Sequence, residues 1–540
     1  MKKIFALTLG ITVLMSLFSC SKKDFDDRYY DPSKTTTVSC EKLMTGVFYT
    51  ACNQYRAYGY NTYWRLFTYE GLMAQLTQQK GFTNNSGGVY YLADSYATDR
   101  WNNFYQTLSQ FRLLEATYEK SEDQATDIVF KDCAEVFVLD HLSQIVDIFG
   151  PVPFSKAGYL GISGDLAASY PEYDSDETLY SMMLDRLGVL YNNINGYATN
   201  PTAIVTAKMK AQDYINRGDL DKWARYANTL RLRLAVHVAA KGSLTSKAKE
   251  VIAECANRKM VDSMEDGIYG SVDTETAGGG MFWEWYRDGF AGNGSNATAS
   301  QAMIDAMRVT GADDPRLKII YNPNEAGEFI GMSVKENSAD QNKYNSYNEW
   351  KDRHYATLDS VTFITNSCMK NWIVSPAENY FLLAEAYQQN YASGDAKAAF
   401  VNGVVMSMEE WFERNMTSVA YRSNPYRHYQ ATAAPTTAEA TAYANEVWDQ
   451  YSNKLEAIMT QKWLHNGIMM AHESWTDIRR TGYPALTYPA DTQSQTTRNI
   501  IQRVLYPNIE KTNNTANYNA ATASFKDENS TVLFWATELK

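Results

Sequence analysis

The spacing of apolar side chains constrains the fold of this chain more than any other feature. Between Asp219 and Lys241, apolar residues recur at every third or fourth position, which gives a helix one apolar face that must be buried. The residues on that face are Trp223, Ala227, Leu230, Leu234 and Val238. Similar spacing occurs over 101–120, 124–149, 376–387, 397–411 and 438–464, and in a run through 191 that follows Asp174–Glu177. Because strand-like alternation is sparse, the pattern predicts a mainly α-helical fold.

Some of these runs also carry signals of where a helix begins or ends. Ser175 or Asp176 is placed to cap the N-terminus of the run through 191. The stretch 458–486 is apolar and charged at helical spacing, and it closes with two arginines ending at Arg480, then Gly482 and a proline. Basic residues followed by glycine and proline are typical of a helix C-terminus.

The domain organisation follows from one contrast along the chain. Amphipathic helices joined by short turns suggest a helical-repeat packing, but no clean 34-residue period is present, so the sequence leaves a repeat architecture open. The stretch 261–374 differs, because it is rich in glycine and asparagine and has few periodic runs. Loops of this length are usually functional or disordered, and its aromatic content argues against disorder. We expect one α-rich domain over 41–540, with a loop-rich ligand region at about 261–374.

The N-terminus predicts export and a lipid anchor. Two lysines precede an uncharged apolar run, Ile4–Phe18, that is too short to span a bilayer and fits a signal peptide over 1–19. Cys20 follows a small residue at the end of this run, which resembles a lipobox, where the cysteine is acylated after cleavage; the alternative is an ordinary secretory cut with an incidental cysteine. Two or more acyl chains anchor a protein stably. The polar and acidic residues over 20–40 predict a solvated, lipidated tether, and no later segment is apolar enough to span.

Several other chemistries find no support in the sequence. The net charge is −12 and no long Lys/Arg run occurs, which argues against a nucleic-acid partner. A zinc-protease pattern begins at His472 but fails because position 476 is Thr476. His465 and His472 could share a helix face, yet a pair without a third ligand is a weak metal site. Phosphate-binding lysine loops and nucleophile elbows are absent. We therefore expect no metal, no cofactor and no catalytic residue.

The cysteines do not form a metal or redox motif. Five follow the predicted lipidation site without any CxxC spacing, namely Cys40, Cys52, Cys133, Cys255 and Cys368. Cys40 and Cys52 could pair in an oxidising compartment, or the thiols could be free and buried.

Aromatic residues in glycine-rich stretches indicate a binding function. The chain has 39 Tyr and 21 Phe, and rings that carry a hydroxyl suit half-exposed positions. Directly after three glycines, one stretch holds Trp283, Trp285, Tyr286, Arg287 and Asp288. Flat rings stack on the apolar faces of sugars while charged neighbours bind the hydroxyls, so these five residues are candidate ligand contacts. The alternative is that the rings pack their loop onto the helices.

A second candidate stretch surrounds Gly59. It contributes Tyr60, Tyr63 and Trp64, for which the alternative is an N-terminal helix packed on the core. Weaker candidates are Tyr90, Tyr91, Tyr344, Tyr347 and Trp350.

Six segments carry motifs that occur in one order along the chain. They are DIFGPVPF at 147–154, KWARYANTLRLRLA at 222–235, DPRL at 314–317, AENYFLLAEAY at 377–387, the run 461–484 and QRVLYP at 502–507. In this order they resemble the signatures of the SusD/RagB family, which are nutrient-binding lipoproteins of the bacterial outer membrane. At 149 and 154, phenylalanine replaces the tyrosine of the family pattern.

The resemblance implies a fold and a function beyond what the residues establish. Tetratricopeptide-like helix pairs would support long loops, and the protein would be non-catalytic. The polar stretch after Cys20 resembles a signal for the cell surface, with a generic linker as the alternative. There the protein would cover a SusC-like TonB-dependent β-barrel and deliver oligosaccharides or peptides. From the residues alone a second class stays open, a lipid-anchored hydrolase such as a glycosidase, whose carboxylates cannot be assigned without geometry.

Overall fold

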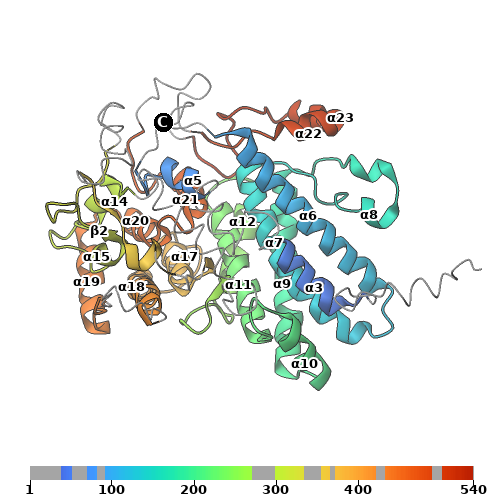
Figure 1. Ribbon diagram of the computed structural model, residues 1–540, viewed down its shortest axis with the longest axis horizontal. Coiled ribbons are helices and arrows are strands. Elements are labelled where there is room, and N and C mark those ends of the chain that lie inside the picture. Colours follow the sequence, from blue (N-terminus) through green and yellow to red (C-terminus); the bar gives the residue numbers. More distant parts are fainter. Residues whose placement is uncertain are drawn as a thin grey trace, which may run out of the picture. The chain divides into compact units, whose positions relative to one another are not determined.

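The chain is mainly α-helical, as the spacing of its apolar residues predicts. The computed structural model describes residues 38–51, 70–81, 92–270, 298–333, 354–364, 366, 371–420, 432–488 and 501–538. Cys40–Lys540 forms one compact unit. Figure 1 shows this unit as groups of helices, with blue-to-green helices on one side and yellow-to-orange helices on the other.

The first group is built on long helices from the N-terminal half of the chain. Its elements are α3 (Cys40–Tyr49), α6 (Asp94–Glu119), α7 (Gln124–Phe149), α8 (Leu160–Ser163), η3 (Leu166–Ser169), α9 (Asp176–Thr199), α10 (Ala203–Gln212), α11 (Leu220–Val238) and α12 (Thr245–Cys255). The pairs α6–α7 and α9–α11 pack side by side (Figure 1). Ser175 caps α9 by accepting a hydrogen bond from Thr178 N.

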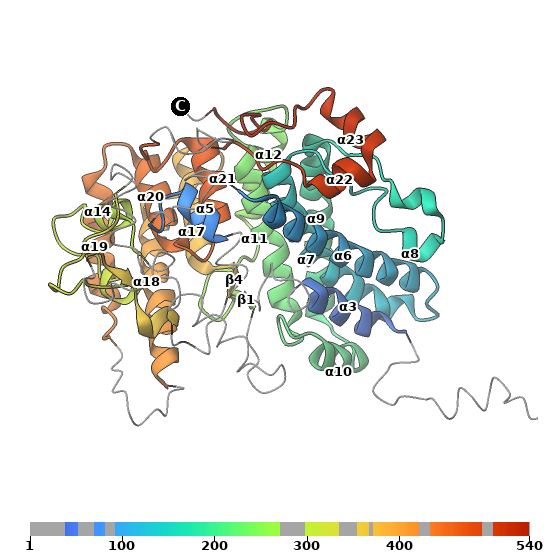
Figure 2. The ribbon, with the colours of Figure 1, turned by 45° about the horizontal axis from the view of Figure 1, so that its top comes forward.

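The second group comes from the C-terminal half. Its helices are α14 (Gln301–Ala306), α15 (Leu317–Ile320), η6 (Ser360–Ile364), α17 (Pro376–Gln388), α18 (Ala396–Ala420), α19 (Thr437–Gln450), α20 (Lys454–Asn466) and α21 (Ala471–Thr481). Ser375 caps α17 with Pro376 in the first turn, and Thr436 and Glu439 form a capping box at α19. Two short helices, α22 (Asn508–Asn513) and α23 (Thr515–Thr522), follow this group in sequence but lie beside the first group (Figure 2).

Two contacts join chain segments that are far apart in the sequence. The central helix α11 packs against α9 and α7 of the first group and against α17 and α21 of the second. The short helix α5 (Glu70–Leu76) lies beside α21 (Figure 1). Directly after α5 in the sequence, Thr77 O accepts from Trp463 Nε1 at 2.9 Å, and Gln79 Nε2 donates to Trp463 O at 2.7 Å.

β-structure is minor in the described part of the chain. It consists of two antiparallel pairs, β1 (Ile268–Gly270) with β4 (Asn371–Val374), and β2 (Tyr321–Asn322) with β3 (Thr357–Leu358). Figure 2 shows β1 and β4 next to α11. All four strands lie within or at the edge of the stretch 261–374 that the sequence sets apart from the helices.

The core confirms the predicted apolar faces. On α11, the five side chains predicted to face inward are fully buried. On α6, the apolar residues at helical spacing are also buried, apart from half-buried Tyr105; they are Trp101, Phe104, Leu108, Phe111 and Leu114. Fully buried large side chains include Trp223, Trp411, Trp463, Trp475 and Trp535. Within the described residues, no helix combines the length and the hydropathy that crossing a membrane requires.

The expectation of one helix over 438–464 is wrong. The chain turns at 451–453, so that α19 and α20 are separate helices. Lys454 Nζ donates to the carbonyls of Trp448 and Tyr451 at 2.6 Å each, which satisfies acceptors left open at the end of α19. Asn453 then caps α20 by accepting from Leu455 N.

The stretch 458–486 is also divided into two helices. α20 ends at Gly467, where φ is +47°, and α21 begins at Ala471. The predicted C-terminal end is confirmed, because α21 stops at Gly482 in the left-handed conformation with φ of +77°.

Candidate functional site

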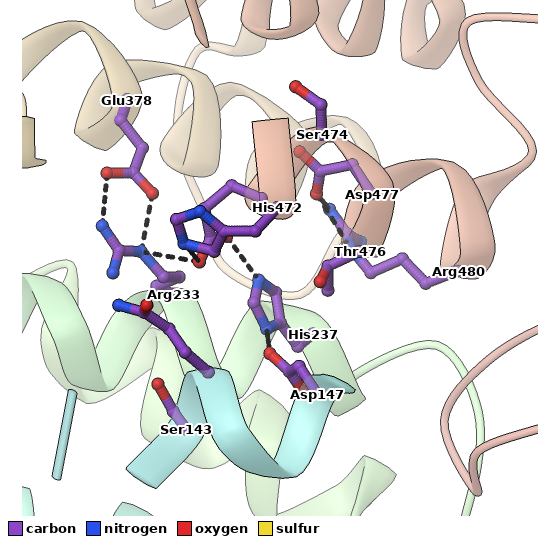
Figure 3. A network of polar contacts seen from close by, with 12 residues as sticks. Ser143, Asp147, Arg233, His237, Glu378, His472, Ser474, Thr476, Asp477 and Arg480 are labelled. Atoms are coloured by element: carbon purple, nitrogen blue, oxygen red, sulfur yellow. Dashed lines mark hydrogen bonds and ion pairs between the residues drawn. The ribbon is translucent and has the colours of Figure 1, made fainter. Parts of the chain in front are cut away.

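A buried network of charged side chains lies where α7, α11, α17, α20 and α21 meet (Figure 3). We call it the charge network. Its members are Asp140, Asp147, Arg233, His237, Glu378, Glu385, Lys462, His472, Glu473, Asp477 and Arg480. Each of these side chains is almost completely shielded from solvent. Charges at this depth are stable only when they are paired and hydrogen-bonded.

Arg233 is the centre of the network. Its guanidinium forms two hydrogen bonds of 2.6 Å with the carboxylate of Glu378 and donates to Ile373 O at 2.9 Å. Asp140 lies 3.4 Å from the same guanidinium and Glu473 lies 3.9 Å from it. Bidentate pairing fixes the direction of the arginine as well as its charge. Arg233 therefore connects α7, α11, α17 and α21 at one point.

His237 lies one turn further along α11, between two carboxylates. Its Nδ1 is 3.5 Å from Asp147, and its Nε2 is 3.3 Å from Glu473 (Figure 3). Burial alone would lower the pKa of His237, but hydrogen bonds and charge interactions with these two carboxylates raise it above its usual value. Burial opposes ionisation of Glu473, yet Arg233 and the two neighbouring histidines hold its pKa well below its usual range.

A second part of the network closes α21 against α17 and α20. Arg480 pairs with Glu385 and lies 2.7 Å from Asp477, while Lys462 lies 3.0 Å from the other oxygen of Asp477. Arg480 thus binds one carboxylate on its own helix, α21, and one on α17, which is distant in the sequence. Because all these groups are sealed from solvent, the charge network supports the scaffold and offers no surface to a ligand.

Three of the stretches that carry predicted ligand contacts border a second feature at one end or both, and we call this feature the anchor cluster. It comprises Gly81, Thr298–Ser300, Ile330–Ser333 and His354–Thr357. Gly81 N donates to Thr298 O at 2.8 Å, and Met332 N donates to Ala299 O at 2.8 Å. Ala299 N donates to Ala356 O at 2.9 Å, and Ala356 N donates to Ile330 O at 2.7 Å.

The anchor cluster joins chain positions that border three stretches of the sequence. Residue 81 precedes 82–91, residue 298 follows 271–297, and residues 333 and 354 flank 334–353. The backbones approach so closely that a Cβ at Gly331 would lie 2.3 Å from the carbonyl carbon of Ser300. Only glycine fits this position without a shift of the backbone. One end of 82–91, one end of 271–297 and both ends of 334–353 are therefore held close together by backbone contacts.

The stretch 271–297 begins directly after β1, which pairs with β4. Tyr269 pairs with Trp372 across the strands, and its hydroxyl donates to Glu410 on α18 at 3.3 Å. Glu410 also accepts from Ala377 N at 3.3 Å. Burial raises the pKa of Glu410 to about 8. The guanidinium of Arg414 lies 4.5 Å from the centre of the Trp372 ring, in cation–π geometry.

The residues that the sequence predicts to bind ligand lie outside the described part of the chain. They are Tyr60, Tyr63, Trp64, Trp283, Trp285, Tyr286, Arg287 and Asp288, together with the weaker candidates Tyr90, Tyr91, Tyr344, Tyr347 and Trp350. The predicted lipidation site Cys20 also lies outside it. What the structure describes is the support at the two ends of 271–297, namely the β1–β4 pair at the start and the anchor cluster at the end.

The two histidines considered as metal ligands have different partners. His465 is buried between the hydroxyls of Ser375 at 2.8 Å and Ser407 at 3.0 Å, and burial lowers its pKa well below the usual value. His472 lies 3.5 Å from Glu473. Within the described residues, no group of three or more His, Cys, Asp or Glu side chains is arranged to hold a metal ion.

The cysteines that the structure describes are free thiols. Cys40, Cys133 and Cys255 are all buried. Burial raises the pKa of Cys40 and of Cys255 to about 12, so both stay protonated at neutral pH. They behave as small apolar side chains in the core.

Most members of the charge network lie in the motif segments of the sequence, but the spacing of those motifs does not identify the network. The signal was present in α11, where Arg231 and Arg233 alternate with leucines in the middle of a strongly amphipathic helix. A charged residue inside such a run must find a buried partner. The partners lie on other helices, so the sequence does not name them.

The chain belongs to the SusD-like family. The family model described as starch-binding and associating with the outer membrane matches residues 32–507. No curated protein sequence matches the chain.

Solved structures share this fold at low sequence identity. A chitin-binding protein is 20% identical, with a TM-score of 0.70 over 92% of this chain and 100% of that chain. A chitin-binding SusD homologue from Flavobacterium johnsoniae is also 20% identical, with a TM-score of 0.68 over 92% of this chain and 99% of that chain. A SusD homologue from Bacteroides uniformis is 19% identical, with a TM-score of 0.67 over 93% and 100%. At such identity the likeness shows the fold.

Proposed function

We propose that this protein is a cell-surface lipoprotein that binds oligosaccharides and delivers them, unchanged, to a SusC-like TonB-dependent transporter of the outer membrane. The observation that carries the proposal is membership over 32–507 in a family described as starch-binding and associating with the outer membrane. Two structures with the same fold are named for chitin binding, which favours a glycan over a peptide as ligand.

The proposed ligand contacts are the rings of 283–286 with the charged pair that follows. Trp283, Trp285 and Tyr286 would stack on sugar faces, while Arg287 and Asp288 would bind hydroxyls. A contact site needs a rigid base if its geometry is to favour one ligand. The anchor cluster and the β1–β4 pair supply such a base at the two ends of 271–297. Tyr60, Tyr63 and Trp64, between α3 and α5, are proposed as a second set of contacts.

Acylation at Cys20 would hold the protein on the membrane, and 20–40 would act as the tether to a single domain over 41–540. The acidic balance of the chain, with a net charge of −12, also suits a neutral glycan better than an anionic ligand.

The experiment uses the chain from Ser21 onward, made without its lipid. Isothermal calorimetry against starch, chitin oligosaccharides, other glycans and peptides measures binding, and product analysis of the same samples measures turnover. We expect binding of at least one glycan without turnover. Trp283→Ala and Trp285→Ala should each weaken binding by about tenfold, which is the loss expected for one stacked ring.

A matched control is Tyr170→Ala, because Tyr170 is a half-exposed ring on the segment after η3, far along the chain from the proposed contacts. Its binding constant should equal that of the unchanged protein. Release of products from any glycan would contradict the proposal and favour a hydrolase. Binding that survives both tryptophan changes would leave the function in place and remove 283–286 from the site.

A further inference from the structure

A hollow of about 620 Å³ opens on the second group of helices, and neither the charge network nor the anchor cluster is part of it. It lies between the start of α15, the turn that ends at Phe329 and the segment that leads into α19. Its apolar lining includes Pro315, Leu317, Phe329 and Pro435. Sites for small molecules have volumes of roughly 300–1,000 Å³, so the hollow has room for a sugar unit or two.

The base of the hollow is held rigidly by Asp314. Its two carboxylate oxygens accept from the guanidinium of Arg316 at 3.0 and 2.6 Å, and one of them also accepts from the hydroxyl of Tyr443 on α19 at 3.0 Å. Arg316 extends this contact to Ser407 at 2.7 Å and to Gln461 at 2.6 Å. The elements that form the hollow are thus bound to α18, α19 and α20, and their positions are set before any ligand arrives.

The charged side chains at the rim differ in whether they already have partners within the protein. Arg308 pairs with Asp313 at 2.7 Å, donates to Phe329 O at 3.2 Å and lies 5.9 Å from the centre of the Phe329 ring. Glu439 is occupied by its capping box, accepting at 2.8 Å from both the backbone N and the hydroxyl of Thr436. Lys318 is exposed, and it has no ion-pair partner in the part of the chain that the structure describes.

This combination matches the chemistry of a sugar ring. Phe329 and the prolines offer flat apolar surface for the C–H face of a pyranose, and Lys318 offers a free donor for a hydroxyl or carbonyl oxygen. Asp313 and Glu439 keep acceptor capacity toward sugar hydroxyls, because a carboxylate accepts more hydrogen bonds than these residues make. An apolar peptide side chain would leave the rim charges unused.

The hollow also lies next to the anchor cluster along the chain. Phe329 directly precedes Ile330, whose carbonyl accepts from Ala356 N in that cluster. We propose that the hollow is a second glycan-contact site, which binds one sugar unit of a neutral oligosaccharide through Phe329 and Lys318. This inference rests on the proposed function, and it adds that long oligosaccharides are bound more tightly than short ones.

The test titrates the chain from Ser21 onward with malto-oligosaccharides and chitin oligosaccharides of increasing length. In the unchanged protein, affinity should rise with length. Lys318→Ala and Phe329→Ala should each weaken binding of the longest oligomers by about fivefold to tenfold, as expected for one lost ring or donor, and leave the shortest unchanged. Lys210→Ala, which changes an exposed lysine on α10, is the matched control and should have no effect at any length.

The outcomes separate this inference from the proposed function. Equal affinities of the unchanged protein and both variants at all lengths would overturn the second site alone. Weakening that is the same for short and long oligomers would also overturn it, because the hollow would then belong to the primary site. If none of these oligomers binds the unchanged protein, the proposed function fails for both glycans and the second site fails with it. Lys318→Ala alters only an exposed side chain, so it stays informative if Phe329→Ala does not fold.

Discussion

Arg233 is the single residue on which the charge network depends most. Replacing it by methionine would leave Glu378, Asp140 and Glu473 buried close to one another without their shared cation. Removing one partner of a buried ion pair costs about 3–5 kcal/mol, because the charge that remains has no compensation. We expect Arg233→Met to lower the free energy of unfolding by about this amount, as measured by urea denaturation.

The matched control is Lys156→Met, which breaks an ion pair with Glu172 that is exposed on both sides. Exposed pairs contribute little because solvent screens them, so this variant should unfold at the same urea concentration as the unchanged protein. Adding Glu378→Gln to Arg233→Met should recover part of the loss. If Arg233→Met were as stable as Lys156→Met, the network would not hold the scaffold together.

Glu410 makes stability depend on pH. Burial raises its pKa from 4.5 to about 8 in the folded protein, so the folded state holds a proton that the unfolded state releases. Its contribution to stability is therefore fully present below pH 4.5 and is lost as pH rises through about 8. Glu410→Gln mimics the protonated form. We expect its melting temperature to equal that of the unchanged protein at low pH and to exceed it by a few degrees above pH 8.

The control for this prediction is Glu409→Gln, at a neighbouring residue that is exposed on the same helix. It should shift the pH profile of melting far less than Glu410→Gln does. Equal melting curves of Glu410→Gln and the unchanged protein above pH 8 would show that Glu410 is ionised in the folded state without penalty.

At the scale of single elements, Gly482 determines how α21 ends. Its φ of +77° lies in the left-handed region, and a Cβ there would meet no atom within 4 Å. The cost of Gly482→Ala is therefore backbone strain alone, about 1 kcal/mol in the free energy of unfolding. Gly196→Ala in the last turn of α9 has equally open surroundings but lies within a helix, so it should stabilise by about 0.5–1 kcal/mol. Chemical denaturation of both variants should show shifts of opposite sign.

The elements also show how far the sequence determines the fold. The apolar period over 124–149 predicts α7 with the observed bounds, because Gly150 stops the helix and nothing interrupts the period before it. The same reasoning fails at 438–464, because three linking residues between α19 and α20 do not break the apolar spacing. The turn there depends on Lys454 bonding to two carbonyls, which is a contact rather than a pattern.

The candidate site was less predictable than the helices. Composition predicts 283–288 as a ligand stretch, and this stays a prediction, but nothing in the sequence brings Gly81, Thr298 and Met332 together. Backbone hydrogen bonds join these segments, and two of the bonded residues, Gly81 and Thr298, are more than 200 residues apart in the sequence. Arg233 and Glu378 likewise pair across 145 residues. Local spacing carries information about elements, whereas such contacts depend on how the elements pack.

At the scale of the whole molecule, α11 is shared by both groups of helices. One side contacts α7 and α9, the other contacts α17 and α21, and the charge network crosses the junction at Arg233 and His237. Release of α11 by either group would break ion pairs of Arg233 or His237 with the other helices. The junction therefore resembles the interior of one domain more than an interface between two.

The prediction that follows is a single cooperative unfolding transition for the chain from Ser21 onward. Differential scanning calorimetry should show one endotherm whose calorimetric enthalpy equals its van't Hoff enthalpy, as for a two-state domain. Arg233→Met should move this endotherm to lower temperature without dividing it, because the network belongs to both groups of helices. Two endotherms in the unchanged protein, of which Arg233→Met shifts only one, would instead mean that the groups fold as separate domains. The comparison tests the single domain expected over 41–540, and it does so without any ligand.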